Sequence, residues 1–354
     1  EGRREEGLKA KSAGSARKHR PSAIPGGSWT WKPPEPWGGR VDDPEDPAAL
    51  RWHQVVRPWD GMPIGAGSGT RRIWFIGCPT DIGVSRNKGR PGAARGSGSL
   101  RRALANLPVR FGDALELIDA GDLEPRDGDL EGLMEGLELL VGAVVASGGF
   151  PVVLGGGHET AYGHHRGLVR GLAALSLPAP RIISFDAHFD LRPEGPPGAP
   201  LHSGNMFRLL AREAGERGEP LEYDVIGIQR SANTLSLFRE ADGLGVRYLP
   251  AREAGSPEAI LGFLRTGRIG DRPLHVTLCT DVISAAHAPA VSAPQPFGLD
   301  PNVVLEGLRH LARSGRAAGL DVAEVSPRYE GDDGTAHLAA VLLFAWVNAM
   351  AGSD

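Results

Sequence analysis

The sequence has few of the residues that define several large classes of protein. Its 354 residues include only two cysteines, Cys78 and Cys279, which excludes a disulfide framework and a cysteine-rich zinc site and predicts a reducing, cytoplasmic setting. No apolar run approaches the roughly 18 residues of a membrane-spanning helix. A net charge of −4 lacks the basic character of nucleic-acid-binding proteins. Because 41% of the residues are hydrophobic, we expect a globular protein with a sizeable core.

The first 70 residues differ in composition from the rest of the chain. Residues 1–23 carry seven lysines and arginines against three glutamates and have no apolar face, which predicts a disordered basic tail. Residues 24–70 are rich in proline and glycine and hold five of the seven tryptophans. Since such large rings are readily buried, we expect an N-terminal arm that lies across the surface of the body. A lid or a subunit contact is the alternative.

Residues 71–354 read as one domain in which apolar runs of strand length alternate with segments of helical periodicity. This pattern predicts a parallel sheet covered by helices on both faces, the α/β class. The clearest helix spans residues 130–146, and two glycines end it. Eight strands are expected, at residues 73–77, 115–119, 151–154, 181–185, 224–228, 247–249, 274–280 and 320–325.

Polar residues follow three of these strands, at the edge where parallel sheets build their sites. A Gly-Gly-Gly-His-Glu sequence follows the third strand; it has no lysine, which makes a phosphate loop a weak interpretation, and His158 suits metal ligation. Asp186, His188 and Asp190 follow the fourth strand, and alternate residues of an extended chain face the same side. Asp281 follows the seventh strand, where a turn or helix-cap role is the alternative.

These five side chains form a set of oxygen and nitrogen donors. Two carboxylates held close together repel each other unless a cation joins them. Carboxylates combined with imidazoles favour Mn²⁺, while Zn²⁺, Fe²⁺ and Ni²⁺ stay open. Asp186 is well placed to bridge two ions, and paired ions about 3.5–4 Å apart activate water and polarise an electrophile.

In this order, the motifs resemble those of the ureohydrolase (arginase–agmatinase) family. The resemblance runs from about residue 71 to the C-terminus, and it is carried by residues 155–159, 184–190, 281–294, 321–327 and 333–336. Within the family, the chain looks most like the branch that hydrolyses N-formimidoyl-L-glutamate to L-glutamate and formamide in histidine degradation. The residues that carry this finer resemblance are 83–90, 227–229, 233–234 and 291–294.

The resemblance implies a three-layer α/β/α fold around an eight-stranded, mainly parallel sheet, and a homo-oligomer, a trimer or a hexamer. It implies two Mn²⁺ ions, one held by His158, Asp186 and Asp190 and the other by Asp186, His188 and Asp281. A metal-activated hydroxide would attack the formimidoyl carbon of the substrate. Glu324 would face the nitrogen end of the substrate, and Asp190 would pass a proton to the leaving amine.

The chain departs from the family pattern at two positions. Cys279 stands where the family has an aspartate that bridges both metals. A thiolate suits Zn²⁺ or Fe²⁺ better than Mn²⁺, so the favoured interpretation is a small neutral strand residue and one weakly bound ion. Ser203 stands where arginase-like members have a histidine, and the adjacent His202 would point to the other face of an extended chain. We therefore assign His202 no proton-shuttle role.

A substrate with two carboxylates needs cationic or amide partners. The loop residues Arg86, Asn87, Lys88 and Arg90 are the candidates, with Arg192 as another. The alternative is that these cations only hold the loop. Agmatine has no carboxylate, so a cationic loop argues against it. Two other functions stay open: hydrolysis of a different small molecule, a guanidino acid or agmatine, and a metal-poor scaffold that lost catalysis through Cys279.

Overall fold

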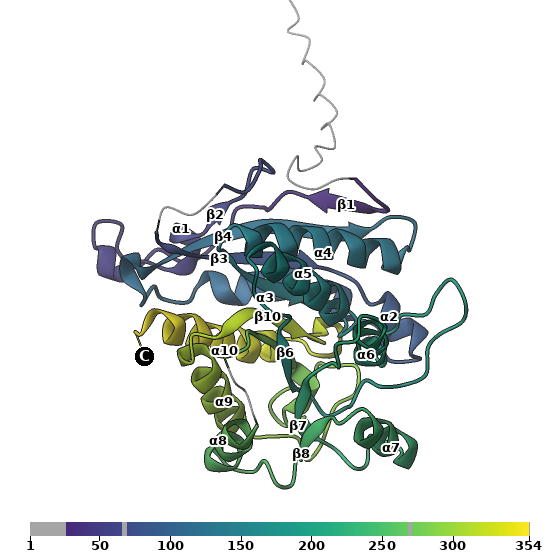
Figure 1. Cartoon of the computed structure of the whole chain (residues 1–354). Coiled ribbons are helices and arrows are strands. Elements are labelled where there is room, and N and C mark those ends of the chain that lie inside the picture. The colour runs from purple at the N-terminus through teal and green to yellow at the C-terminus, as the bar shows by residue number, and fades with distance from the viewer. Residues whose placement is uncertain (1–25, 66–68, 268–270, 354) are drawn as a thin grey trace, which may run out of the picture.

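The computed structural model describes residues 26–65, 69–267 and 271–353. The tail predicted for residues 1–23 lies outside the described residues. Within them, the strands form a single sheet of ten with the order β1-β4-β3-β5-β10-β9-β6-β7-β8, and β2 pairs with β4 (Figure 1). The strands are β1 (Trp29–Lys32), β2 (Arg57–Pro58), β3 (Arg71–Cys78), β4 (Leu115–Pro125), β5 (Phe150–Gly155), β6 (Arg181–Phe185), β7 (Tyr223–Ile228), β8 (Arg247–Pro250), β9 (Leu274–Cys279) and β10 (Ala317–Ala323).

The eight predicted strands are β3 to β10, and their pairings are all parallel. The sheet is larger than expected because the N-terminal arm adds β1 and β2. Both pair with the outer edge of β4, β2 in parallel at Ile118 and Asp119 and β1 antiparallel over 122–125. An uncovered edge strand invites pairing with another chain, so the arm protects this edge of the sheet.

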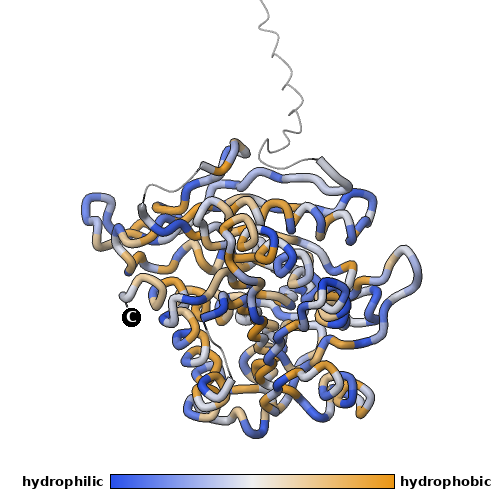
Figure 2. Tube along the Cα trace, viewed as in Figure 1, coloured by the Kyte–Doolittle hydropathy of each residue, from blue (hydrophilic) through white to orange (hydrophobic). Residues whose placement is uncertain are grey.

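Helices cover both faces of the sheet, which confirms the predicted three layers. One hydrophobic cluster joins α3, α8, α9 and α10 to one face, and a second joins α4, α5, α6 and α7 to the other (Figure 1). Apolar residues concentrate along the strands and the inward sides of the helices (Figure 2). The helices are α1 (Trp52–Val55), α2 (Ile82–Arg86), α3 (Gly96–Ala105), α4 (Leu130–Ala146), α5 (Thr160–Ala174), α6 (Met206–Glu216), α7 (Leu235–Gly243), α8 (Pro257–Thr266), α9 (Pro301–Arg313) and α10 (Gly334–Ala351), with 3₁₀ turns at Pro47–Ala49, Ala93–Arg95, Gly112–Ala114, Thr280–Val282 and Pro327–Tyr329.

Helix α10 is apolar on nearly all sides, and its length and composition match those of a membrane-crossing helix. Its side chains Leu342, Leu343 and Trp346 are buried in the protein core, where the helix packs against α3 and α9. The ring of Trp346 lies 6.2 Å from that of Phe150 in β5. The packing is that of a core helix.

The tryptophans of the arm point inward, as the sequence predicted. Trp29, Trp31, Trp52 and Trp59 are buried. The indole N–H of Trp31 donates to the carbonyl oxygen of Ala120 in β4 at 2.7 Å. Burial of these rings fixes the arm on the domain.

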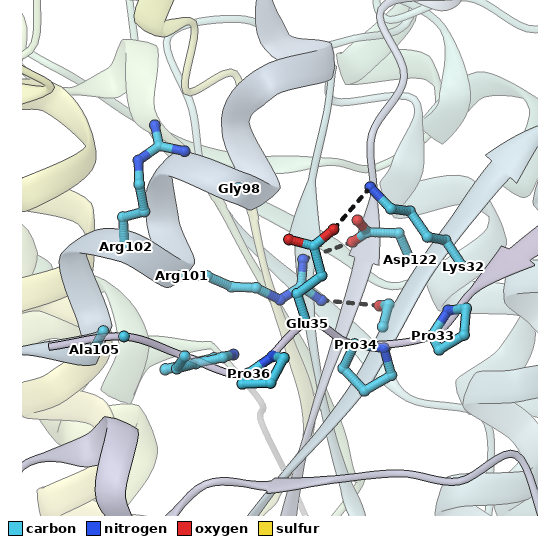
Figure 3. Close-up of a pocket in the computed structure, with 13 residues that line it drawn as sticks. Lys32, Pro33, Pro34, Glu35, Pro36, Gly98, Arg101, Arg102, Ala105 and Asp122 are labelled. Atoms are coloured by element: carbon cyan, nitrogen blue, oxygen red, sulfur yellow. Dashed lines mark hydrogen bonds and ion pairs between the residues drawn. The ribbon is translucent and has the colours of Figure 1, made fainter. Parts of the chain in front are cut away.

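A pocket of about 280 Å³ lies between the arm and α3, with the prolines of residues 33–36 along one wall (Figure 3). Arg101 of α3 reaches across it to the carboxylate of Asp122 and the carbonyl oxygen of Gly121 (Figure 3). The same guanidinium pairs with the buried carboxylate of Asp119, which also accepts the indole N–H of Trp37 at 2.6 Å. These contacts connect the arm, α3 and β4.

Candidate metal centre and active site

Four neighbouring strands, β5, β10, β9 and β6, end side by side and bring the predicted polar residues together. A cavity of about 310 Å³ lies at their carboxyl ends, a volume typical of small-molecule sites. It shares no lining residue with the pocket at the arm. The residues that line it are Asn87, Lys88, Gly89, Arg90, His158, His188, Asp190, Arg192, Ser203, Cys279, Asp281, Ser292, Ala293 and Glu324.

Two histidines and three aspartates make close contacts at the base of this cavity. His158 Nδ1 lies 2.9 Å from Asp186 Oδ2 and 3.0 Å from Asp190 Oδ2. His188 Nδ1 lies 3.4 Å from Asp186 Oδ1 and 3.1 Å from Asp281 Oδ2. Asp186 therefore belongs to both groups, one oxygen facing each histidine, which is the arrangement expected of a bridging carboxylate.

The loop after β6 brings its three polar side chains together through a backbone conformation that differs from the predicted one. We expected an extended chain over 186–190, but β6 ends at Phe185 and the chain turns, because the backbone N–H of His188 donates to Asp186 Oδ1 at 2.7 Å. Asp190 then takes a left-handed conformation with φ of 50°. Glu324 and Lys88 also have positive φ, at 67° and 60°, so the backbone is bent at three residues that line the cavity. Such strain is typical of functional sites.

The loop that contains Gly155, Gly156 and Gly157 connects the end of β5 to the end of β10 through hydrogen bonds. A Cβ on Gly156 would lie 1.8 Å from the carbonyl oxygen of Thr80, so only glycine fits there. The backbone N–H of Glu324 donates to the Gly156 carbonyl at 2.8 Å, and the backbone N–H of His158 donates to Glu324 Oε1 at 3.1 Å. The loop thereby sets the positions of both His158 and Glu324.

The two imidazoles sit among excess negative charge. Burial alone lowers a histidine pKa, but Asp186 and Asp190 outweigh it and raise the pKa of His158 well above its ordinary value. In the same way, Asp281 and Asp186 outweigh burial and raise the pKa of His188. The carboxylates therefore stabilise a positive charge at these two positions, which a proton or a metal ion can supply.

Burial acts on the acids in the opposite sense. It raises the pKa of Glu324 to about 8, helped by the nearby carboxylates of Glu159 and Asp281. It raises the pKa of Asp190 to about 6, with a further contribution from Asp186. The second oxygen of Glu324, Oε2, is buried and has no hydrogen-bond partner among the described residues. This oxygen is available to a ligand in the cavity.

Cys279, the departure from the family pattern, lies inside the site. Its Sγ and the ligand atoms of His158 and Asp186 lie within 4.8 Å of one another. Burial, followed by the charge of Asp186, raises the pKa of the thiol well above its ordinary value. The thiol is therefore neutral in the metal-free protein, and its sulfur lies at ligand distance from the other two donors.

The residues present fit a pair of divalent cations. The donors are carboxylate oxygens, imidazole nitrogens and one thiol, in two groups that share Asp186. Three buried carboxylates facing two imidazoles leave negative charge that metal ions can balance.

The cationic loop residues are divided between the cavity and structural contacts. Arg86 does not line the cavity, because its guanidinium donates to both carboxylate oxygens of Glu131, at 2.7 and 3.0 Å. Arg90 lines the cavity, but it donates to the carbonyl oxygens of Val291 and Ser292 and stacks on a tyrosine ring. Through these contacts its side chain joins the loop to residues 291–292, and whether it also binds substrate stays a prediction.

Three further residues face the cavity with capacity for a ligand. Lys88 and Arg192 are exposed and make no ion pair within the described residues. Asn87 donates to the hydroxyl of Ser203 at 3.2 Å. His202 is absent from the cavity lining because both ring nitrogens contact backbone, Nδ1 at Gly204 and Nε2 at a carbonyl oxygen. This agrees with its exclusion as a proton shuttle.

Sequence analysis missed a third cluster, which is fully buried behind His158. His164, His275 and Asp321 bring their ligand atoms within 4.8 Å of one another. His164 is fully buried in the core. The only indication in the sequence was a charged residue within the apolar run of β10.

Comparison with known proteins identifies the family. The arginase family model matches residues 71–347. The chain is 38% identical over 322 residues to formimidoylglutamase of Clostridium tetani, covering 89% of this chain and 94% of that protein. It is 41% identical over 314 residues to formimidoylglutamase of Chromobacterium violaceum, covering 88% and 96%. The chain belongs to the arginase family.

Solved structures agree. A variant of Trypanosoma cruzi formiminoglutamase, determined with Mn²⁺, aligns with a TM-score of 0.71 and 26% identity, covering 80% of this chain and 94% of that one. Formimidoylglutamase of Bacillus subtilis aligns with a TM-score of 0.74 over 90% and 98% of the chains, and its 22% identity supports the fold alone. The predicted arginase-like α/β fold is confirmed.

Proposed function

We propose that this protein is a metal-dependent hydrolase that cleaves N-formimidoyl-L-glutamate to L-glutamate and formamide, a reaction of histidine degradation. Relatives at 38–41% identity that span almost the whole chain carry the name formimidoylglutamase. The observation that carries the proposal is the cavity itself, where two groups of metal-ligand atoms share Asp186 below a rim with Lys88 and Arg192.

Two Mn²⁺ ions are the cofactor that this site suits. His158, Asp186 and Asp190 would hold one ion, with Cys279 beside it, and Asp186, His188 and Asp281 would hold the other. Carboxylates and imidazoles are donors that Mn²⁺ accepts. When bound, such a pair lowers the pKa of a water molecule and polarises the carbon that the water attacks.

Glu324 and Asp190 supply the charge and the proton transfer around the reacting carbon. The formimidoyl group is an amidine, and its cationic form would pair with the unpartnered Oε2 of Glu324 and favour the ionised carboxylate that burial otherwise disfavours. The bond between the formimidoyl carbon and the glutamate nitrogen breaks, and the water oxygen leaves in formamide. Asp190, which lines the cavity, passes the proton to the departing amine.

Lys88, Arg192 and Asn87 recognise the two carboxylates of the substrate. The two cations line the cavity without an ion-pair partner among the described residues, so binding a carboxylate breaks no existing pair. Arg90 holds the loop that presents them. Arg86 anchors the same loop from outside the cavity through Glu131.

A substrate panel tests the proposal. Protein loaded with Mn²⁺ is assayed with N-formimidoyl-L-glutamate, L-arginine, agmatine and 4-guanidinobutyrate, and products are identified by NMR. We expect equal amounts of formamide and glutamate, with a kcat/KM at least about 100-fold above the other substrates, since a site with unpaired cations discriminates against ligands that lack the matching charge. A higher kcat/KM on a guanidino compound would identify a different ureohydrolase. Bound Mn²⁺ without hydrolysis of any substrate would identify a scaffold.

We also infer a cytoplasmic homo-oligomer, a trimer or a hexamer, from the resemblance to the family. Both cysteines are free thiols and buried, which suits a reducing compartment. Sedimentation equilibrium of the full chain measures the assembly, and a monomeric mass would contradict this inference.

A further inference from the structure

A buried chain of hydrogen bonds starts from the face of His158 that points away from the carboxylates. His158 Nε2 lies 2.8 Å from the hydroxyl oxygen of Thr277 in β9. That hydroxyl donates to Oδ1 of Asp321 in β10, the residue paired with Thr277 in the register of the two strands. Both Thr277 and Asp321 have no exposed surface. This chain of hydrogen bonds therefore links His158, a proposed metal ligand, to Asp321, a carboxylate that has no role in the proposed reaction.

Asp321 is held by two further donors. Its Oδ2 lies 2.7 Å from His164 Nδ1 and 2.6 Å from His275 Nε2. Burial opposes ionisation, but these two imidazoles outweigh it and lower the pKa of Asp321 below its ordinary range. His275 Nδ1 in turn contacts His165 Nδ1 at 3.2 Å. Every neighbour of this carboxylate is placed to donate a proton to it.

The protons in the network can be assigned one at a time. An ionised carboxylate only accepts, so Thr277 must give its single hydroxyl proton to Asp321. The Thr277 oxygen can then only accept from His158, which places a proton on His158 Nε2. With a metal ion in place of the second proton, His158 would be neutral, and the free lone pair of Nδ1 would lie on the side that faces Asp186 and Asp190.

The cluster behind His158 is not a further metal site. One carboxylate faces His164 and His275, and neutral histidines that each donate one proton satisfy it. Burial lowers the pKa of His164 to about 4, so this residue stays neutral. In the cavity, by contrast, three carboxylates face two imidazoles. The two clusters thus differ in charge balance and serve different purposes.

We propose that Thr277 and Asp321 are positioning residues of the metal centre, which fix His158 in the tautomer and orientation that aim Nδ1 at the metal. The inference rests on the proposed metal-dependent function, although it concerns metal binding and not the identity of the substrate. Partners that orient a metal-ligating histidine in this way typically change metal affinity 10–100-fold when removed.

The experiment compares Thr277→Val with Thr277→Ser. Valine keeps the shape of threonine and removes the hydroxyl, whereas serine keeps the hydroxyl. The Mn²⁺ dissociation constants of the full chain are measured by equilibrium dialysis together with the melting temperature of the metal-free protein. We expect Thr277→Val to weaken the Mn²⁺ site that His158 would hold about 10–100-fold, and Thr277→Ser to restore it.

Thr280→Val is the matched control. Thr280 is a buried neighbour whose hydroxyl donates to the Ala323 carbonyl at 3.0 Å, so its removal costs a hydrogen bond without touching His158. We expect a lower melting temperature and unchanged Mn²⁺ affinity. A double variant of Thr277→Val with Asp321→Asn should lose little more affinity than either single variant, because both act through one chain of bonds.

Wild-type Mn²⁺ affinity in Thr277→Val, or equal loss in the valine and serine variants, would overturn the proposal. If N-formimidoyl-L-glutamate is not the substrate, the result is different. Wild-type protein would then bind Mn²⁺ and leave this compound intact, while the valine and serine variants at position 277 would still differ in Mn²⁺ affinity.

Discussion

The Sγ atom of Cys279 lies within 4.8 Å of a carboxylate oxygen of Asp186, the one side chain that belongs to both groups of ligand atoms. The site therefore keeps a donor at the position where the family pattern has an aspartate. What differs is its chemistry, because a thiol is softer than a carboxylate and is neutral until a metal or base removes its proton. This difference is expected to govern which metal the centre prefers.

Cys279→Asp should raise the affinity for Mn²⁺ relative to Zn²⁺, since it replaces a soft donor with a hard one. It should also lower the melting temperature of the metal-free protein, because a further carboxylate joins Asp186, Asp281 and Glu324, which already raise the pKa of this thiol. Competition dialysis with both metals and thermal unfolding measure the two effects. An unchanged preference between Mn²⁺ and Zn²⁺ would show that Cys279 makes no contact with the ions.

Asp186→Asn and Asp281→Asn should differ in metal content. Asp186 contacts both histidines, whereas Asp281 contacts only His188. We expect Asp186→Asn to lose both ions, and kcat/KM to fall at least about 100-fold, a loss typical when one group that stabilises developing charge is removed. Asp281→Asn should keep one ion. Elemental analysis after dialysis measures the difference, and equal metal content in the two variants would contradict a shared role for Asp186.

Lys88→Ala and Arg192→Ala should each raise KM for N-formimidoyl-L-glutamate about tenfold, because each loses one charge-assisted hydrogen bond of about 1.4 kcal/mol. The amount of bound Mn²⁺ should not change. Both side chains line the cavity. The control is Arg57→Ala, which removes a positive charge from an exposed ion pair with Glu116 outside the cavity. If the control raises KM as much as the two cavity variants, the effect is one of net charge and the assignment fails.

The buried histidines predict how stability depends on pH. Burial lowers the pKa of His164 to about 4 and that of His165 well below 6.5. At these two histidines the unfolded chain binds more protons than the folded one from pH 6.5 down to about 4, so their contribution to stability falls as the pH falls. His164 alone contributes on the order of 3 kcal/mol by pH 4, at about 1.4 kcal/mol per pKa unit.

Urea denaturation of the metal-free wild type and of His165→Phe between pH 7 and 4 measures the contribution of His165 as the difference between their slopes of stability against pH. His165→Phe removes one of these two groups, so stability should rise less steeply with pH than in wild type, even though the variant is less stable at pH 7 because His275 Nδ1 loses its donor. A slope equal to wild type in His165→Phe would show that this residue is charged in the folded protein.

Much of the centre was predictable because parallel strands carry their sites at one end. His158, Asp186, His188, Asp190 and Asp281 each follow a strand identified from its apolar run, and neighbouring strand ends must lie close together. The same apolar runs predicted the eight parallel strands. The two arm strands were missed because β2 has two residues and β1 has four, too few for a periodic pattern.

Features that depend on partners distant in the sequence were not predictable. Arg86 and Asn87 are adjacent, yet Arg86 turns to Glu131 and Asn87 faces the cavity. Thr277 and Asp321 become partners only through the register of β9 with β10, which the apolar runs do not encode. The bend at Asp190 depends on a side-chain bond within its own loop and on a left-handed backbone. The first two features depend on tertiary contacts, and the third depends on a local backbone conformation that the sequence pattern does not show.

The most direct test of the account is a titration of metal-free protein with Mn²⁺ in which bound metal and formamide release are followed together. The two groups that share Asp186 predict that hydrolysis of N-formimidoyl-L-glutamate rises with bound metal and reaches its plateau at two ions per chain. Hydrolysis by the metal-free protein, or a fully loaded chain that releases no formamide, would contradict the account.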